Sequence, residues 1–172
     1  DTPVIMLPAR LTRWKGHEVL IKALALIKDI RFFCVLVGDH DTKRNYKSEL
    51  ENRIKFQGLT NRVKITGHCK DMVSAYKISD IVISASLDPE PFGRITVEAQ
   101  AMGCVVVAAD HGGAQETIQH NLTGILVEPR NSEALADGIK KALEMKSEDR
   151  ASMGIAAREF VSSNFSRETM CY

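Results

Sequence analysis

Short runs of β-branched, apolar residues recur along this chain, and segments rich in helix-forming residues separate them. Two of these runs, Ile81–Ser84 and residues 105–108, enclose one helical segment that ends in glycine. Such runs are typical of strands that are buried on both faces of a parallel sheet. We expect strands at residues 4–7, 32–37, 62–67, 81–84, 105–108 and 124–127. This alternation predicts an α/β fold with a doubly wound, parallel sheet of about six strands.

The length and charge of the chain limit the classes of protein to which it can belong. At 172 residues it fits a single domain, residues 1–172, that buries a sizeable core. Hydrophobic residues make up 44% of the chain and charged residues 26%, and the net charge is +1. No basic stripe is interleaved with aromatic residues, which are only 6% of the chain. The composition therefore gives no sign of nucleic-acid binding.

Cysteine use and hydropathy favour a cytoplasmic protein. Four cysteines lie far apart in the sequence: Cys34, Cys69, Cys104 and Cys171. This spacing is typical of reduced thiols and not of a disulfide framework or a zinc site. No apolar run approaches the length of a membrane span, and no signal peptide opens the chain. The chain enters its first expected strand almost at once, which is compatible with a piece cut from a longer protein.

The segment between the two strands that enclose a helix holds two glutamates. Gly93 permits a close approach of a ligand to the backbone, and the free N–H groups of Phe92, Gly93 and Arg94 would form a helix start that accepts an anion. Glu90 precedes the helix and Glu98 lies about one turn inside it, so both carboxylates can face one mouth. Carboxylates accept hydrogen bonds from neighbouring hydroxyls, which favours a ligand that is part sugar and part phosphate. Spacing alone also permits one Glu placed by the helix dipole and a second on a solvated face.

Glu90 and Glu98, the Pro-Phe-Gly between them and the Glu-Ala-Gln-Ala-Met-Gly run that begins at Glu98 resemble the paired-glutamate motif of one enzyme family. These are the retaining, nucleotide-sugar-dependent glycosyltransferases with the two-domain GT-B fold, of the large family 4 or group 1 type. The family contains many bacterial lipopolysaccharide, capsule and phosphatidylinositol mannosyltransferases. The resemblance implies that this chain is the C-terminal, donor-binding half, a Rossmann-like domain with three α/β/α layers. The N-terminal acceptor domain would then be absent from this chain.

A basic loop follows the first expected strand. Arg10 and Lys15 would lie above the carboxyl end of that strand, where open α/β sheets bind ligands, and two cations suit a diphosphate. A basic pair in a loop is also common on a solvated surface. The family carries an Arg-Leu…Lys-Gly element that holds the donor diphosphate, and Arg10-Leu11 with Lys15-Gly16 matches it. The resemblance therefore implies that Arg10 and Lys15 bind the donor.

Further donor-binding positions follow from the resemblance. In the family, the end of one strand lends its main chain to the nucleotide base, at positions that match Lys64 and Ile65. Gly38 ends the second expected strand beside the ligand cleft and is a further donor-binding candidate. Paired glycines that open a short helix also offer a second potential anion-binding helix start. The Gly-Gly…Glu turn of the family is matched by Gly112, Gly113 and Glu116.

Two features near the expected strand ends point more weakly to other chemistry. Asp39 and Asp41 would bind a divalent metal only with help from substrate phosphates and neighbouring oxygens, and the alternative is a plain strand-end loop. The family works without a bound metal and without a cofactor, which favours the loop. His68 has no acid partner beside it in sequence, so we expect a loop residue and not a catalytic base.

Helical spacing predicts how several helices pack and where they begin. Residues 43–57 are expected to form an amphipathic helix that Gly58 stops. Its inward-facing residues are expected to be Tyr46, Leu50, Ile54 and Phe56. Asn131 and Ser147 are expected to cap the two helices that follow the last strand. Residues 166–172 would begin one more helix, and the resemblance implies that this helix is truncated.

The resemblance gives each site residue a role in transfer from a nucleotide-sugar, most simply a UDP- or GDP-sugar. The bond between the anomeric carbon and the diphosphate breaks, so negative charge develops on the leaving phosphate. Arg10, Lys15 and the amides of residues 92–94 would stabilise that charge in place of a metal. Glu90 would orient the sugar hydroxyls, Glu98 would hold the ribose, and configuration would be retained. The candidate catalytic residues are therefore Arg10, Lys15 and Glu90.

Three hypotheses on function remain. The first is the donor-binding half of a hexosyltransferase, which binds the donor but transfers nothing without the N-terminal domain of the same polypeptide. The full-length enzyme would act in lipopolysaccharide, capsule or glycolipid synthesis and associate peripherally with the inner face of the membrane. The second is a nucleotide-sugar epimerase, which the spacing of Glu90 and Glu98 fits less well. The third is a non-catalytic nucleotide- or partner-binding α/β domain, such as a receiver or a dinucleotide binder. A dinucleotide binder should show a glycine-rich turn after the first strand, which this chain lacks.

Overall fold

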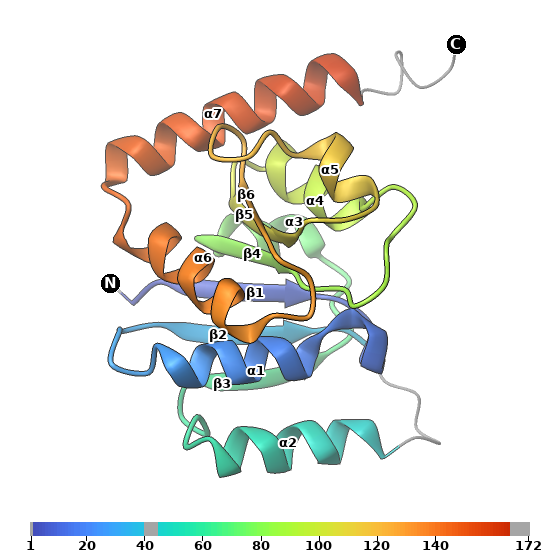
Figure 1. Cartoon of the computed structure of the whole chain (residues 1–172), viewed down its shortest axis with the longest axis vertical. Coiled ribbons are helices and arrows are strands. Elements are labelled where there is room, and N and C mark those ends of the chain that lie inside the picture. Colours follow the sequence, from blue (N-terminus) through green and yellow to red (C-terminus); the bar gives the residue numbers. More distant parts are fainter. Residues whose placement is uncertain (1, 40–44, 166–172) are drawn as a thin grey trace.

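The computed structural model describes residues 2–39 and 45–165, and the structural account is confined to them. Predictions about Asp41, about Cys171, about the first turn of the helix expected over residues 43–57 and about a helix over residues 166–172 lie outside this part of the chain. Six parallel strands form one sheet in the order β3-β2-β1-β4-β5-β6 (Figure 1). They are β1 (Val4–Pro8), β2 (Phe33–Val37), β3 (Val63–Gly67), β4 (Ile81–Ser84), β5 (Val105–Ala109) and β6 (Ile125–Val127).

Helices cover both faces of the sheet, as the alternating pattern predicted (Figure 1). On one face lie α1 (His17–Leu26), α2 (Tyr46–Phe56) and α6 (Ser132–Glu144). On the other face lie α3 (Met72–Lys77), α4 (Arg94–Ala101) and α5 (Gly113–Thr117), and α7 (Ser147–Asn164) packs against α4. One turn of 3₁₀ helix, η1 (Arg13–Lys15), precedes α1. The prediction of a doubly wound, three-layer α/β/α domain is confirmed.

Side chains from the two faces of the sheet belong to two separate hydrophobic cores. Ile81 and Ile83 of β4 belong to the core cluster that includes residues of α1, α2 and α6, whereas Val82 belongs to the cluster that includes residues of α3 and α4. This alternation follows from the two-residue period of a strand, and all three side chains are fully buried. The absence of polar residues from Ile81 to Ile83 is therefore a consequence of helices on both sides of the sheet.

The strand order reverses between β1 and β4, which lie next to one another at the centre of the sheet. Since all strands are parallel, the loops that follow β1 and β4 leave the same edge of the sheet. In open α/β sheets the crevice at such a reversal is where ligands bind. The fold therefore brings the basic loop after β1 to the glutamate-containing loop after β4.

One side chain of α2 does not pack as the sequence predicted. Phe56 was predicted to face inward and is 88% exposed, because it lies about 200° around the helix from Ile54. Tyr46, Leu50 and Ile54 are buried as predicted.

Asn131 caps α6, with its side chain accepting hydrogen bonds from the N–H groups of Glu133 and Ala134, each 3.0 Å long. Ser147 does not cap α7: it is the first helical residue, and Lys146 stands at the cap position without a side-chain hydrogen bond. Within the part of the chain that the structure describes, no helix combines the length and the hydropathy needed to cross a membrane.

Candidate functional site

The loops after β1 and β4 are joined by an ion pair. The Nζ atom of Lys15, at the end of η1, lies 2.8 Å from Oε1 of Glu90. Both side chains are largely enclosed, with 11% of Lys15 and 19% of Glu90 exposed. The hydroxyl of Ser86 donates a hydrogen bond to the same carboxylate oxygen. The structure thus brings together two of the three candidate catalytic residues, at the reversal of strand order.

The loop that carries Lys15 is fixed against the end of β4 by its backbone. The N–H of Leu87 donates to the carbonyl of Trp14 over 2.6 Å. Gly16 has φ = +74°, and a Cβ added there would lie 1.8 Å from the carbonyl oxygen of Ala85. Only glycine fits this conformation and this space. The Lys-Gly pair of the sequence therefore places the ammonium of Lys15 because Gly16 lets its loop dock on β4.

Trp14 adds an aromatic surface at the edge of the pair. The Nζ atom of Lys15 lies 4.1 Å from the centroid of the Trp14 ring, within the range of a cation–π contact. Trp14 itself is 36% exposed. The ammonium therefore lies between a carboxylate and an aromatic face.

The start of α4 presents backbone N–H groups beside Glu90. Gly93 has φ = +74° and precedes Arg94, the first helical residue. The hydroxyl of Thr96 donates to the carbonyl of Gly93 over 2.6 Å and fixes this turn. The backbone hydrogen bonds of the described residues do not engage the N–H groups of Phe92, Gly93 and Arg94. A helix start with N–H groups of this kind is suited to an anion.

The Gly-Gly turn supports Glu90. A Cβ on Gly112 would lie 2.6 Å from the carbonyl oxygen of Glu90, and one on Gly113 would lie 2.3 Å from the carbonyl carbon of Phe92. The N–H of Gly113 donates to the carbonyl of Glu90 over 2.7 Å. Glycine is required here because two loops meet backbone against backbone. The turn, expected as a second anion site, uses one of its N–H groups to position Glu90, while Glu116 is exposed.

Glu98 has partners of its own. Tyr76 of α3 donates to its Oε2 over 2.9 Å, and Arg94 pairs with its Oε1 over 3.1 Å, one helical turn away. Burial first, and then the charge of Glu98 and this hydrogen bond, raise the pKa of Tyr76, so its hydroxyl remains a donor. Within the described residues, no hydrogen bond or ion pair joins Glu98 to Glu90. The two glutamates therefore occupy separate environments near one helix start.

The other candidate residues that the structure describes do not contact the Lys15–Glu90 pair through their side chains. Arg10 is exposed directly after β1, and within the described residues no ion pair joins it to Glu90. Gly38 packs against the preceding loop, since a Cβ there would lie 1.9 Å from the carbonyl oxygen of Ala9. Lys64 is exposed and Ile65 half-buried on the edge strand β3, where both line a hollow beside α2. The structure does not bring the side chains of Lys64 and Ile65 to the Lys15–Glu90 pair.

His68 is exposed in the loop after β3. Asp39 follows Gly38, and its carbonyl accepts a hydrogen bond from the N–H of Leu11 over 2.9 Å. Among residues 2–39 and 45–165, no three His, Cys, Asp or Glu side chains gather closely enough to hold a metal ion. Since Asp41 lies outside these residues, the aspartate pair is not described as a unit.

Sequence reasoning missed three residues around the site. Ser86 and Tyr76 bond to the two glutamates, and His111 accepts or donates a hydrogen bond with the carbonyl of Ser86 over 2.9 Å. Ser86 comes two residues after β4, which places it at the ligand edge, but a single serine there has no distinctive spacing. Tyr76 and His111 reach the site from α3 and the loop after β5, and only the fold reveals that proximity.

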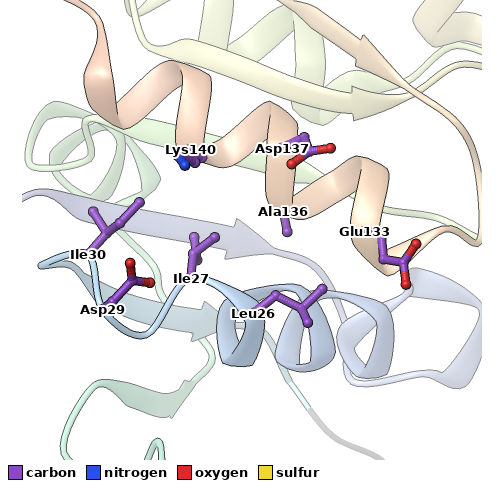
Figure 2. A pocket seen from close by; sticks show the side chains of 8 residues that line it. All are labelled: Leu26, Ile27, Asp29, Ile30, Glu133, Ala136, Asp137 and Lys140. Carbon is purple, nitrogen blue, oxygen red and sulfur yellow. The ribbon is translucent and has the colours of Figure 1, made fainter.

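A second hollow lies away from this edge. It lies between the end of α1 and α6, and its lining combines Leu26 and Ile27 with Asp29, Glu133 and Lys140 (Figure 2). Helix α1 begins just after Lys15 and ends at Leu26, so this groove lies toward the end of α1 that is remote from the ion pair. It is no part of the candidate site.

The model of the family described as "Glycosyl transferases group 1" matches residues 1–160. The chain belongs to this family. A glycosyltransferase from Rickettsia africae has a solved structure that is 42% identical and superposes with a TM-score of 0.95, over 99% of this chain and 45% of that one. A second solved structure, that of the Anabaena protein HepE in complex with UDP and glucose, is 36% identical, with a TM-score of 0.93, over 99% of this chain and 46% of that one.

Curated relatives that are named as glycosyl-group transferases agree with this assignment. One is the GDP-mannose-dependent alpha-(1-6)-phosphatidylinositol monomannoside mannosyltransferase of Mycobacterium tuberculosis, 30% identical over 99% of this chain and 46% of the relative. The chain thus spans under half the length of these relatives. The family is one of enzymes, and the fold is that of one half of the GT-B glycosyltransferases, as the paired-glutamate motif predicted.

Proposed function

We propose that the chain is the donor-binding half of a retaining glycosyltransferase that moves a hexose from a nucleoside-diphosphate sugar to an acceptor. The observation that carries this proposal is the Lys15–Glu90 pair, 2.8 Å apart, beside the open N–H groups of residues 92–94. A diphosphate sugar needs positive charge for its phosphates and a carboxylate for its hydroxyls. This arrangement supplies both in one enclosed place.

The proposed roles follow from charge development during transfer. The bond from the anomeric carbon to the diphosphate oxygen breaks, and a bond to the acceptor oxygen forms on the same face of the sugar. Lys15, the N–H groups of residues 92–94 and the exposed guanidinium of Arg10 stabilise the leaving diphosphate electrostatically. Their positive charge takes the place that a metal has in other transferases, so we expect activity of the full-length enzyme to persist in excess chelator.

The two glutamates divide the donor between them. Glu90, released from Lys15 when the phosphates bind, accepts hydrogen bonds from the sugar hydroxyls while Ser86 keeps its carboxylate in place. Glu98, held by Tyr76 and Arg94, accepts from the ribose hydroxyls. The main chain at Lys64 and Ile65, on the edge strand β3, recognises the base together with Gly38 at the end of β2.

The nature of the donor and acceptor is proposed from the relatives. Structures of a relative with UDP and a curated relative that depends on GDP-mannose support a UDP- or GDP-sugar donor. We propose an acceptor in lipopolysaccharide, capsule or glycolipid synthesis, bound by an N-terminal domain of the same polypeptide, in a cytoplasmic enzyme that associates peripherally with the membrane. The present chain alone then binds the donor and transfers nothing.

An amide NMR titration of the chain tests this proposal, with UDP, GDP, ADP and CMP added in turn. Binding of one diphosphate with shifts at residues 64–66 and 92–98 would support the site and name the donor class. Shifts confined to the groove between α1 and α6, or none with any nucleotide, would contradict it.

A further inference from the structure

His17 is a buried histidine beside the loop that carries Lys15, and the roles proposed above do not involve it. It is the first residue of α1, two positions after Lys15, and its side chain is 0% exposed. Within the described residues, neither ring nitrogen makes a hydrogen bond. Buried polar atoms are normally paired, so a histidine enclosed in this way at a candidate site requires an explanation.

The ring of His17 lies beneath the loop that carries the two cations. Main-chain groups of Ala9 and Thr12, which bracket Arg10 in sequence, approach the imidazole and favour its protonated form. Burial has the larger and opposite effect, with Lys15 adding to it, and together these lower the pKa of His17 to about 4. The ring is therefore neutral at physiological pH, with one nitrogen able to donate and the other able to accept.

The far side of the ring is closed by Tyr46 of α2. The two ring centroids lie 6.1 Å apart at an interplanar angle of 79°, an edge-to-face contact. The ring of His17 is thus in contact with α2 through Tyr46. The loop that carries Lys15 is held by the contact of Gly16 with Ala85 and by the hydrogen bond between Leu87 and Trp14.

We propose that His17 is a positioning residue for the donor diphosphate: its buried imidazole supports the main chain at Ala9 and Thr12 and so places Arg10 and Lys15. The N–H groups of Ala9 and Thr12 already donate elsewhere, so their carbonyls are what the ring can bond. A neutral ring has one N–H, which donates to one of these carbonyls when the loop settles onto the phosphates. This inference rests on the proposed function, since it concerns how that same site holds a diphosphate.

Substitution of His17 by leucine separates this role from that of an ordinary core residue. His17→Leu keeps most of the volume and removes two buried, unpaired nitrogens, so the chain should unfold at the same or a higher denaturant concentration. The affinity for UDP or GDP, whichever binds the unchanged chain, should nevertheless fall about tenfold. Loss of affinity without loss of stability is the signature of positioning.

Two conservative variants show whether the ring nitrogens carry the effect. His17→Asn retains a polar group near the place of Nδ1, and His17→Gln retains one near Nε2. At least one of them should bind within about threefold of the unchanged chain, since one hydrogen bond is worth roughly that difference. Tyr46→Phe, the matched control, removes an unpaired buried hydroxyl from the far side of the ring and should leave nucleotide affinity unchanged.

Isothermal calorimetry of these four variants with UDP and GDP decides the outcome. If the unchanged chain binds a nucleotide and His17→Leu binds it equally well, the role of His17 is overturned while the proposed function stands. If neither polar variant restores the affinity that His17→Leu loses, shape and not hydrogen bonding is responsible, and the inference is also overturned. If the unchanged chain binds neither nucleotide, the proposed function fails, and the inference fails with it.

Discussion

The ammonium of Lys15 lies 2.8 Å from the carboxylate of Glu90, and these two residues come from loops that follow neighbouring, non-consecutive strands. The contact satisfies two charges that would otherwise be enclosed without partners. The same two groups are those proposed to receive the diphosphate and the sugar, so the proposal implies that binding of the donor exchanges this ion pair for contacts to the ligand.

Replacement of Lys15 by methionine should weaken nucleotide diphosphate binding strongly, by about a hundredfold, because it removes the enclosed cation of the site. It should also lower the free energy of unfolding by about 1–2 kcal/mol, since Glu90 keeps Ser86 but loses its charged partner. Calorimetry and urea unfolding measure the two effects. Lys22→Met, an exposed lysine on the following helix, is the control and should change neither. Undiminished affinity in Lys15→Met would remove Lys15 from the site.

The separate environments of the two glutamates predict separate losses. Glu98→Ala should weaken binding of the bare nucleotide, because its carboxylate, held by Tyr76 and Arg94, is the proposed partner of the ribose. Glu90→Ala should spare the bare nucleotide and weaken only the sugar-bearing donor. Calorimetry with UDP against UDP-glucose, or GDP against GDP-mannose, measures the difference. Equal losses of bare-nucleotide affinity in both variants would refute this division of roles.

Two glycines allow the effect of a steric clash on the free energy of unfolding to be separated from the effect of backbone strain. Gly16 and Gly58 both have positive φ angles, of 74° and 71°. A Cβ at Gly16 would lie 1.8 Å from the carbonyl oxygen of Ala85, whereas one at Gly58 would meet nothing within 4 Å. Gly58→Ala should therefore cost about 1 kcal/mol of unfolding free energy from backbone strain alone. Gly16→Ala should cost about 2 kcal/mol more, because the clash with backbone adds to the strain.

Denaturant unfolding of the two glycine variants measures this difference directly. A further expectation concerns function: Gly16→Ala should also reduce nucleotide affinity, since the loop cannot dock on β4 with Lys15 in place. Equal destabilisation by both substitutions would show that the loop yields at Ala85, and that its position is not fixed by that contact.

The sequence predicted the sheet and the positions of its ligand edge because both depend on local pattern. The run from Ile81 to Ile83 has no polar interruption, and this alone indicates helices on both faces. The Lys-Gly and Pro-Phe-Gly turns could be placed at strand ends for the same reason. That Lys15 and Glu90 form a pair could not be predicted, since it depends on the adjacency of β1 and β4, which are separated by two other strands in sequence.

The residues that sequence reasoning missed act through tertiary contacts. Ser86 and Tyr76 bond to the glutamates from an extended loop and a short helix, and neither has a characteristic spacing. Gly112 and Gly113 were recognised as a turn, but their close approach to Glu90 and Phe92 depends on how two loops pack. The prediction for Phe56 was wrong because it followed the apolar character of the side chain and not its position around the helix.

The buried His17 makes the free energy of unfolding depend on pH between its folded-state pKa and its ordinary pKa. The folded-state pKa of His17, about 4, lies below the ordinary value of 6.5, because burial disfavours the charged ring. Between these values the unfolded chain binds more protons than the folded one, so stability rises with pH. The contribution of His17 should be fully present above pH 6.5 and decline as the pH falls toward 4, by about 2–3 kcal/mol in all.

Urea unfolding at pH 7, 6 and 5 measures this dependence, with His17→Leu as the reference, because the two chains differ in a single titrating group. The free energy of unfolding of the unchanged chain should fall more steeply over this range than that of His17→Leu. His120, which is exposed and bonds to the N–H of Leu126, provides the matched control: His120→Leu should keep the steep slope. Parallel pH profiles for the unchanged chain and His17→Leu would mean that the ring takes up its proton without unfolding, and hence that its enclosure beneath the Lys15 loop opens readily in solution.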